Sequence, residues 1–124
     1  MLLNMYAGVP QNLPAWDNQV VTGEMGDCVS VIVLWNLAGT QYTNVRGWHG
    51  MGGIEAINFQ NLLHGVPNHI TTQIIVIASS MGTLGYLLMN VQTRIFALRP
   101  AANIRIVKNL SNARVNRQGF VTRA

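Results

Sequence analysis

The apolar residues of the chain fall into short β-type runs separated by turn residues. The strongest run spans residues 28–36, where Val29-Ser30-Val31-Ile32-Val33-Leu34-Trp35 is apolar on both faces of an extended chain. This pattern is typical of a strand buried in the middle of a sheet. Further strands are predicted over residues 19–24, 41–48, 70–79, 104–107, 113–115 and 120–122, and residues 116–119 are expected to join the last two as a hairpin.

Two segments carry the periodicity of a helix. Residues 54–63 have the spacing of a short amphipathic helix that stops at His64-Gly65. Residues 81–98 repeat apolar side chains at 84, 87, 88, 91, 95 and 98, and Pro100 ends the pattern. Strands mixed with two helices predict an α+β fold, in which a mixed, sandwich-like β-sheet core is covered on one side by the helices.

The remaining segments are predicted to be irregular. Residues 1–18 are expected to be a lead-in that packs Tyr6 and Trp16 onto the body, because prolines, asparagines and glutamines interrupt any regular pattern there. Residues 47–53, Gly47-Trp48-His49-Gly50-Met51-Gly52-Gly53, predict a shaped loop because glycine weakens regular structure. Met81 and Met89 are expected in the core. The length of 124 residues predicts one domain, 1–124.

Composition excludes several kinds of enzyme. The chain has only four acidic residues, so two-metal nucleases and paired-carboxylate glycosidases are disfavoured. Its single cysteine, Cys28, excludes an internal disulfide and any multi-cysteine metal centre. His64 and His69 have no third ligand nearby in sequence, so no metal is expected. No cofactor is expected either, since covalent catalysis by a cysteine and a histidine needs none. No apolar stretch is long enough to span a membrane, and the first residues lack the pattern of a signal peptide.

The charge of the chain is segregated. The net charge is +4, and seven of the eight cations follow position 90: Arg94, Arg99, Arg105, Lys108, Arg114, Arg117 and Arg123. One interpretation is a surface for nucleic acid or another anionic partner. The other is a solvated sheet face whose charges oppose aggregation, and it is favoured because no aromatic residues alternate with the arginines.

The candidate chemistry lies in Thr22, Gly26-Asp27-Cys28 and His49. Cys28 opens the most apolar strand directly after a glycine turn, where the backbone N–H groups of Gly26 and Asp27 can form an oxyanion hole. A cysteine with a histidine is the minimum for covalent attack on an amide, and either the Thr22 hydroxyl or a backbone carbonyl of its strand is expected to orient His49. Trp48 is a candidate wall of a substrate slot. The alternative is that Cys28 is an inert core residue.

Residues 20–31, VVTGEMGDCVSV, resemble the nucleophile region of the chemotaxis receptor glutamine deamidases. These enzymes share a fold and a catalytic plan with the cytotoxic necrotizing factor toxins. In that superfamily a threonine, a Gly-Ser-Cys turn that leads into a hydrophobic strand, and a downstream histidine form the site; Asp27 stands here where the serine is usual. The resemblance implies a cysteine hydrolase fold of the cytotoxic necrotizing factor type, with Thr22, Cys28 and His49 in the catalytic positions.

The resemblance further implies a protein glutamine deamidase that acts through a thioester, of the kind found in chemotaxis adaptation and among bacterial effector toxins. The expected location is then the bacterial cytoplasm, or a host cell reached by a route without a signal peptide. Transglutamination on the same site remains open, as do the target protein and the oligomeric state. The alternative from another class is a non-catalytic module that binds nucleic acid or another anionic partner through the Arg-rich C-terminal third.

Overall fold

The computed structural model describes residues 1–4, 9–50, 58–83 and 86–124, which form an α+β fold. The described strands are β1 (Gln11–Asn12), β2 (Gln19–Val21), β3 (Val29–Ala38), β4 (Gln41–Gly50), β5 (Gln73–Ala78), β6 (Asn103–Val107), β7 (Ala113–Asn116) and β8 (Val121–Arg123). The helices are α1 (Phe59–Leu62), α2 (Ser80–Thr83) and α3 (Tyr86–Leu98). The expected fold class is therefore confirmed.

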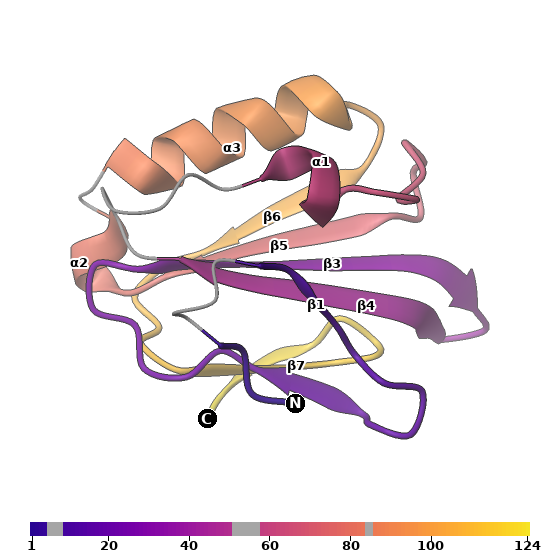
Figure 1. The fold of residues 1–124 in the computed structure, drawn as a ribbon, viewed down its shortest axis with the longest axis horizontal. Coiled ribbons are helices and arrows are strands. Elements are labelled where there is room, and N and C mark those ends of the chain that lie inside the picture. The colour runs from indigo at the N-terminus through magenta and orange to yellow at the C-terminus, as the bar shows by residue number, and fades with distance from the viewer. Residues whose placement is uncertain (5–8, 51–57, 84–85) are drawn as a thin grey trace.

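The strands form two sheets. A five-stranded sheet has the order β1-β4-β3-β5-β6, and a three-stranded sheet has the order β2-β7-β8. The pairs within the larger sheet are antiparallel except β5–β6, which is parallel because α2 and α3 form the crossover between the two strands. α1 and α3 lie above the five-stranded sheet and the three-stranded sheet lies below it, so the molecule has three layers (Figure 1).

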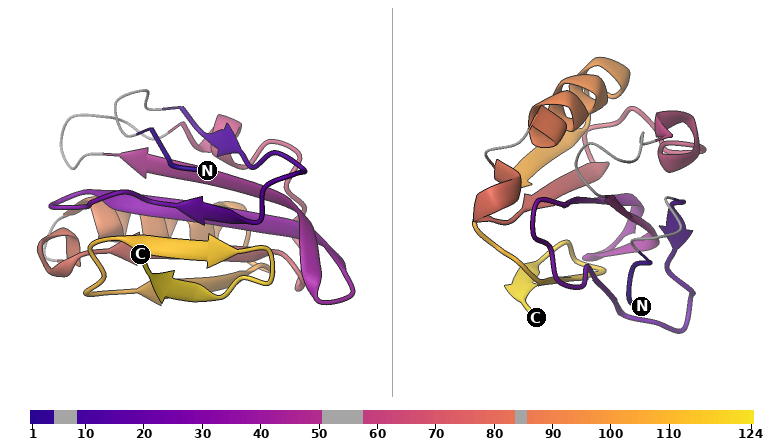
Figure 2. Two further views of the ribbon diagram at one scale, coloured as in Figure 1. Left: turned by 90° about the horizontal axis from the view of Figure 1, so that it is seen from below. Right: turned by 60° about the vertical axis from the view of Figure 1, so that its left-hand side comes forward.

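β3 is the central strand of the larger sheet and is buried on both faces, as its apolar pattern predicts. Its residues alternate between two cores. Cys28, Ile32 and Leu34 belong to the core that faces the three-stranded sheet. The core under the helices contains the alternate residues Val29, Val31, Val33 and Trp35. In the view from below, β7 and β8 lie in front of the larger sheet, and both chain ends are on this side (Figure 2).

The predicted helices are partly confirmed. α1 begins after the N-cap Asn58, whose side chain accepts a hydrogen bond from the Asn61 amide. The earlier part of the expected helix, residues 54–57, lies outside the described residues. The second expected helix is present as α2 and α3, and Leu88, Val91 and Ile95 on its apolar stripe are buried. Met81 and Met89 are exposed instead of buried, so their assignment to the core was wrong.

A loop was expected at residues 47–53. This expectation is wrong for residues 47–50, because β4 continues through Gly47 to Gly50. The two glycines serve close packing within the strand. A Cβ atom on Gly47 would lie 2.6 Å from Leu3 Cδ2, and one on Gly50 would lie 1.9 Å from Trp48 Cζ2. Both positions therefore need glycine for space. Residues 51–53 lie outside the described residues.

The N-terminal segment contains more regular structure than the sequence predicts. It includes β1, which pairs with β4, and Leu2 forms a bridge with Val21. Trp16 is 82% exposed, so the expectation that it packs onto the body was wrong, and Tyr6 lies outside the described residues. The segment is instead fastened by Arg117.

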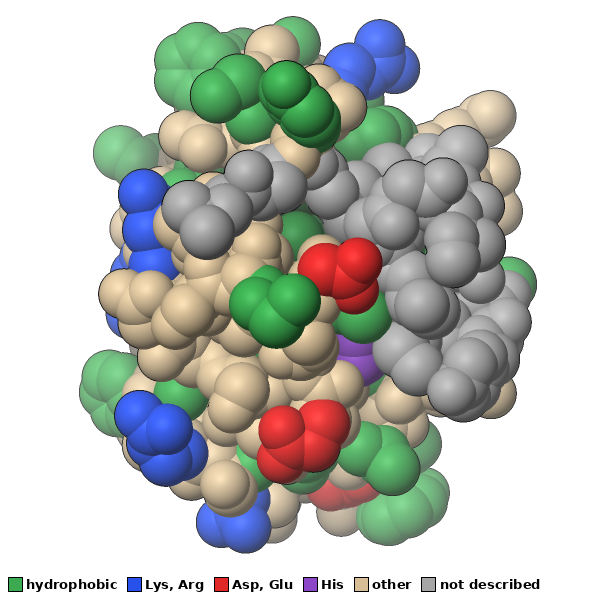
Figure 3. Space-filling view, turned by 90° about the vertical axis from the view of Figure 1, so that its left-hand side faces the viewer, with side chains coloured by type: hydrophobic (Ala, Val, Ile, Leu, Met, Phe, Trp, Pro, Cys, Tyr) green, Lys and Arg blue, Asp and Glu red, His purple; other side chains and the backbone are tan. Residues whose placement is uncertain are grey.

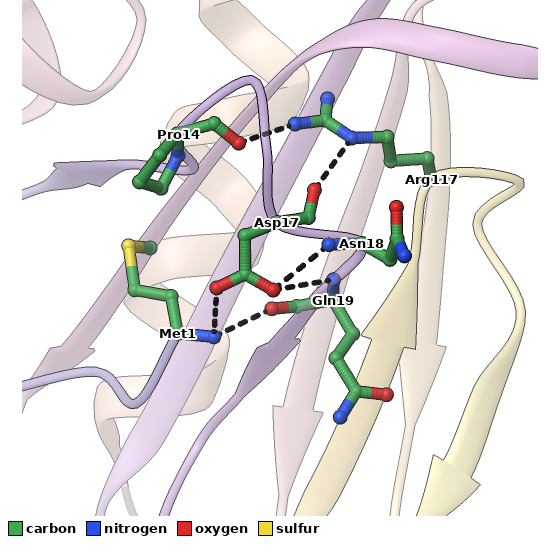
Figure 4. A network of polar contacts seen from close by, with 6 residues as sticks. All are labelled: Met1, Pro14, Asp17, Asn18, Gln19 and Arg117. Atoms are coloured by element: carbon green, nitrogen blue, oxygen red, sulfur yellow. Dashed lines mark hydrogen bonds and ion pairs between the residues drawn. The ribbon is translucent and has the colours of Figure 1, made fainter.

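Arg117 joins this segment to the C-terminal hairpin (Figure 4). Its Nη2 donates to the Pro14 carbonyl at 2.7 Å and its Nε donates to the Asp17 carbonyl at 2.9 Å. The Asp17 carboxylate in turn accepts from the Met1 ammonium at 2.8 Å. This hydrogen bond from the ammonium is the main reason that the pKa of Asp17 is lowered. One buried arginine thus holds together parts of the chain that are 100 residues apart.

Candidate active site

Cys28 and His49 lie on the same face of the five-stranded sheet. Ser30 in β3 is paired with His49 in β4, and Cys28 precedes Ser30 by two residues, so it shares the side-chain direction of Ser30. Cys28 lies one residue before β3, and continuing the strand register by that residue places it diagonally opposite His49, a position in which Cβ atoms lie about 7–8 Å apart or somewhat closer. The two residues face the three-stranded sheet. Both are nearly closed to solvent, with exposures of 4% for Cys28 and 3% for His49.

One ring nitrogen of His49 has a defined partner. Nδ1 lies 2.7 Å from the backbone carbonyl oxygen of Thr22, which follows β2 in the opposite sheet. A carbonyl only accepts hydrogen bonds, so Nδ1 carries the proton and Nε2 presents a lone pair in the neutral ring. Nε2 is buried and has no hydrogen-bond partner among the described residues. The ring is thus held in the tautomer that leaves Nε2 able to accept a proton.

Burial also affects the charge of His49. Desolvation lowers the pKa of the imidazole from its ordinary value of 6.5, and the hydrogen bond to Thr22 opposes this effect in part. The neutral ring is therefore favoured near neutral pH. A neutral imidazole with an available lone pair is the form required of a general base.

The Thr22 side chain does not orient His49; its backbone does. The Thr22 hydroxyl donates to the Gly23 carbonyl at 2.9 Å and accepts from the Ala113 amide at 3.0 Å. Of the two orienting groups expected from the sequence, the hydroxyl and a backbone carbonyl of this strand, the structure has the carbonyl. Thr22 is fully buried, and its hydroxyl joins the segment after β2 to the start of β7.

The bend before Cys28 carries amides without an acceptor among the described residues. Gly26 and Asp27 are exposed, and within the described ranges their N–H groups make no hydrogen bond. The Gly26 carbonyl accepts a hydrogen bond from the Ser79 hydroxyl, and Ser79 Oγ accepts in turn from the Gly82 amide at 3.2 Å. The bend is therefore fixed through its carbonyl while its N–H groups stay available for an oxyanion.

Ser79 and Gly82 were not expected at the site. Ser79 follows β5 directly, and β5 lies beside β3, so the pairing of the two strands brings it to the Gly26 bend. Gly82 in α2 packs on the backbone of Cys28: a Cβ atom there would lie 2.7 Å from the Cys28 carbonyl oxygen. Only the strand pairing reveals these positions, because 53 residues separate Ser79 from Gly26.

A pocket of about 440 Å³ adjoins His49. It is lined by Leu2, Leu3, Asn4, Thr22, Gly23, Glu24 and His49. Cys28 does not appear among these described lining residues, so the pocket reaches the imidazole and not the thiol. Glu24 is the one acidic residue among the lining residues that the structure describes. Figure 3 shows acidic side chains at the centre and in the lower part of one face of the molecule, with basic side chains toward its margins.

Trp48 lies on the opposite side of β4 from His49. Its side chain is 1% exposed and belongs to the core under the helices, and its ring covers Gly50. The strand alternation that directs His49 toward the three-stranded sheet directs Trp48 away from it. The structure therefore does not place Trp48 at the His49 pocket, where the sequence analysis expected a slot wall.

The histidines outside the site do not form a metal centre with other described side chains. His69 Nδ1 contacts the hydroxyl and amide of Thr71, in a local turn. In the part of the chain that the structure describes, no three His, Cys, Asp or Glu side chains come together as metal ligands.

Several C-terminal arginines bind the protein's own backbone. Arg99 donates to the carbonyls of Leu63, Val66 and Leu98. Arg105 donates to the Gly119 carbonyl, and Arg117 also donates to the Thr43 carbonyl at 3.1 Å. Three of the seven cations after position 90 thus hold loops in place. The alternative, anion-binding interpretation needs these arginines to face a partner, but their donors already contact the protein's own carbonyls.

Comparison with protein-family models gave no match, and comparison with curated proteins gave none either. Among the described residues, no helix has the length and apolar character needed to cross a membrane. The resemblance at residues 20–31 therefore remains a prediction, and the function is argued from the geometry of the site.

Proposed function

We propose that the protein is a cysteine amidohydrolase that deamidates a glutamine side chain of a protein substrate. The observation that carries the proposal is His49: a buried histidine whose Nδ1 is fixed by the Thr22 carbonyl, whose Nε2 has no partner among the described residues, and which lies diagonally opposite the only cysteine. A structural histidine normally has both nitrogens satisfied. An unsatisfied Nε2 on the same sheet face as a thiol suits proton transfer once the two groups approach, since no hydrogen bond joins them among the described contacts.

The reaction would proceed in two steps. His49 Nε2 takes the proton of the Cys28 thiol, and the sulfur attacks the carboxamide carbon to form a tetrahedral oxyanion, which the Gly26 and Asp27 amides bind. His49 returns the proton to the leaving nitrogen, the C–N bond breaks, and ammonia departs from a thioester. Water, deprotonated by His49, then attacks the thioester, and glutamate and the free thiol are released.

The substrate must reach side chains that are almost closed to solvent. Leu2, Leu3 and Asn4 line the pocket next to His49, and Leu3 packs against Gly47 of β4. We propose that this N-terminal segment moves when substrate binds. Glu24 in the lining and the exposed Asp27 favour basic residues next to the target glutamine, since opposite charges raise the rate of encounter.

A peptide that carries a chloroketone analogue of glutamine tests the proposal. We expect it to alkylate Cys28, the only thiol of the chain, and a chloroketone with a norleucine side chain to react far more slowly. His49→Gln should abolish the difference, whereas His64→Gln, at an exposed loop histidine, should preserve it. Equal labelling by the two reagents, or labelling that is insensitive to His49→Gln, would contradict the proposed function.

The alternative function, an anion-binding module, can be tested with the same protein by measuring its binding to oligonucleotides. A module of this kind would bind oligonucleotides with an affinity that falls steeply with salt, and its cysteine would not react with the glutamine analogue.

A further inference from the structure

One edge of the five-stranded sheet is open. β6 pairs with β5 on one side, and among the described residues no strand pairs with its other side. The Asn103 amide donates to the Thr72 carbonyl at 2.9 Å, so the backbone groups at positions 103, 105 and 107 turn toward β5. In a strand the direction alternates, and the N–H and C=O groups of Ile104 and Ile106 therefore turn outward.

An apolar groove runs along this edge. It has a volume of about 650 Å³ and lies between β6 and α3. Its walls include Met89, Gln92, Thr93 and Phe96 from α3, and Ile104 and Ile106 from β6. The α3 residues follow the i, i+3, i+4, i+7 spacing of one helix face. Met89 is 67% exposed and Phe96 is 65% exposed, so together with the groove they form a contiguous exposed apolar surface, which is typical of interaction sites.

We propose that this edge and groove form a docking site for an extended, acidic segment of a partner protein. The segment adds a strand to β6 through the backbone groups of Ile104 and Ile106, and its alternate side chains enter the groove beside α3. Main-chain hydrogen bonds provide affinity in this mode of binding, and the groove selects apolar side chains at every second position.

The charge of the surroundings determines the character of the partner. The described residues of the groove lining include no carboxylate, and the sequences of α3 and β6 contain none. Lys108 directly follows β6 and is exposed, and Arg105 in β6 keeps its charge although it donates to the Gly119 carbonyl; neither forms an ion pair with the described carboxylates. The described acidic residues, Asp17, Glu24 and Asp27, come before β3. Acidic residues next to the apolar positions of the partner are therefore favoured.

The edge is also poorly protected against pairing. Natural edge strands commonly carry a proline, a bulge or an outward charge that prevents addition of another strand. β6 has no proline, and its one charged residue, Arg105, turns toward the three-stranded sheet, where it donates to the Gly119 carbonyl. This unprotected edge, the groove beside it and the surrounding positive charge carry the proposal, which does not depend on the chemistry at Cys28.

The test is selection of eight-residue peptides from a displayed random library by the full chain, followed by affinity measurements on synthetic peptides. We expect the selected peptides to alternate apolar with other residues and to contain Asp or Glu. Phe96→Glu should weaken their binding at least tenfold, whereas Tyr86→Glu, at an exposed aromatic of the same helix outside the groove lining, should leave it within twofold. Methylation of the alternate peptide nitrogens that face β6 should abolish binding, because it removes the main-chain N–H groups that donate to the carbonyls of Ile104 and Ile106.

Backbone NMR locates the bound peptide. The amides of Ile104 and Ile106 should become protected from hydrogen exchange, and amides in β1, at the other edge, should not change. Selected peptides that lack acidic residues, that bind Phe96→Glu as well as wild type, or that leave the Ile104 and Ile106 amides unprotected would overturn the proposal. A dimer that is lost in Phe96→Glu, in a chain that selects no peptide, would also overturn it and would assign the edge to a second copy.

Discussion

The burial of His49 predicts a specific dependence of stability on pH. The folded protein holds the imidazole with a pKa below 6.5, whereas the unfolded chain has the ordinary value. As the pH falls below about 6.5, the unfolded state binds a proton that the native state does not, and the free energy of unfolding decreases. The slope from this one group has an upper limit of about 1.4 kcal/mol per pH unit, because at most one proton separates the two states.

The assay is urea unfolding of wild type and His49→Gln at a series of pH values from neutral to mildly acidic. We expect the stability of wild type to fall with decreasing pH more steeply than that of His49→Gln, so that the difference between them shrinks. Asp17, whose pKa is lowered from 3.8, contributes only at more acidic pH. His64→Gln is the matched control and should keep the wild-type slope. Parallel slopes for wild type and His49→Gln would refute the reasoning that burial holds His49 neutral.

Three further substitutions test packing and hydrogen bonding elsewhere in the fold and at Thr22, each by urea unfolding. Gly50→Ala should cost about 1–3 kcal/mol, because the new methyl group overlaps the buried Trp48 ring; wild-type stability would show that the ring moves freely. Thr22→Val should cost about 1–3 kcal/mol because it leaves a buried β7 amide without its acceptor, while Thr22→Ser retains stability; equal stability of the two variants would disprove this role. Arg117→Gln should cost about 2–4 kcal/mol by releasing carbonyls of the N-terminal segment, and a loss under about 0.5 kcal/mol would contradict its role as a clamp.

The sequence predicts the fold class because most elements carry local signals. The doubly apolar run at residues 28–36 predicts the central strand, and β3 has that position. The hairpin at residues 116–119 is confirmed by the β7–β8 pair, with Gly119 at a φ of +84°, where glycine is favoured.

The errors arise where distant residues decide the local structure. Gly47 and Gly50 were assigned to a loop because glycine is locally unfavourable in a strand. In the structure, Leu3 and Trp48 occupy the space that a side chain would need, and no local pattern shows this. Arg117 was assigned to a solvated or anion-binding surface for the same reason, since its carbonyl partners lie up to 103 residues away.

The candidate site was predictable in part. The strand-opening position of Cys28 and His49 as its partner could be identified from sequence, but His49 was expected in a loop, whereas it lies in β4, which pairs with β3. The Thr22 carbonyl contact and the Ser79 contact depend on how the two sheets stack and on which strand lies beside β3. The stacking of the sheets and the order of the strands are known only from the tertiary structure.

The most direct test of the account is the rate at which iodoacetamide labels Cys28 in native buffer and in low concentrations of urea. A catalytic thiol reached by local movement of the N-terminal segment should be labelled at a rate that changes little with urea, and His49→Gln should slow this labelling at least tenfold, roughly, as expected for loss of a general base. An inert core thiol would be exposed only by global unfolding, so its labelling rate would rise with urea in proportion to the unfolded fraction and would not fall in His49→Gln. That second result would contradict the assignment of Cys28 and His49 as a catalytic pair.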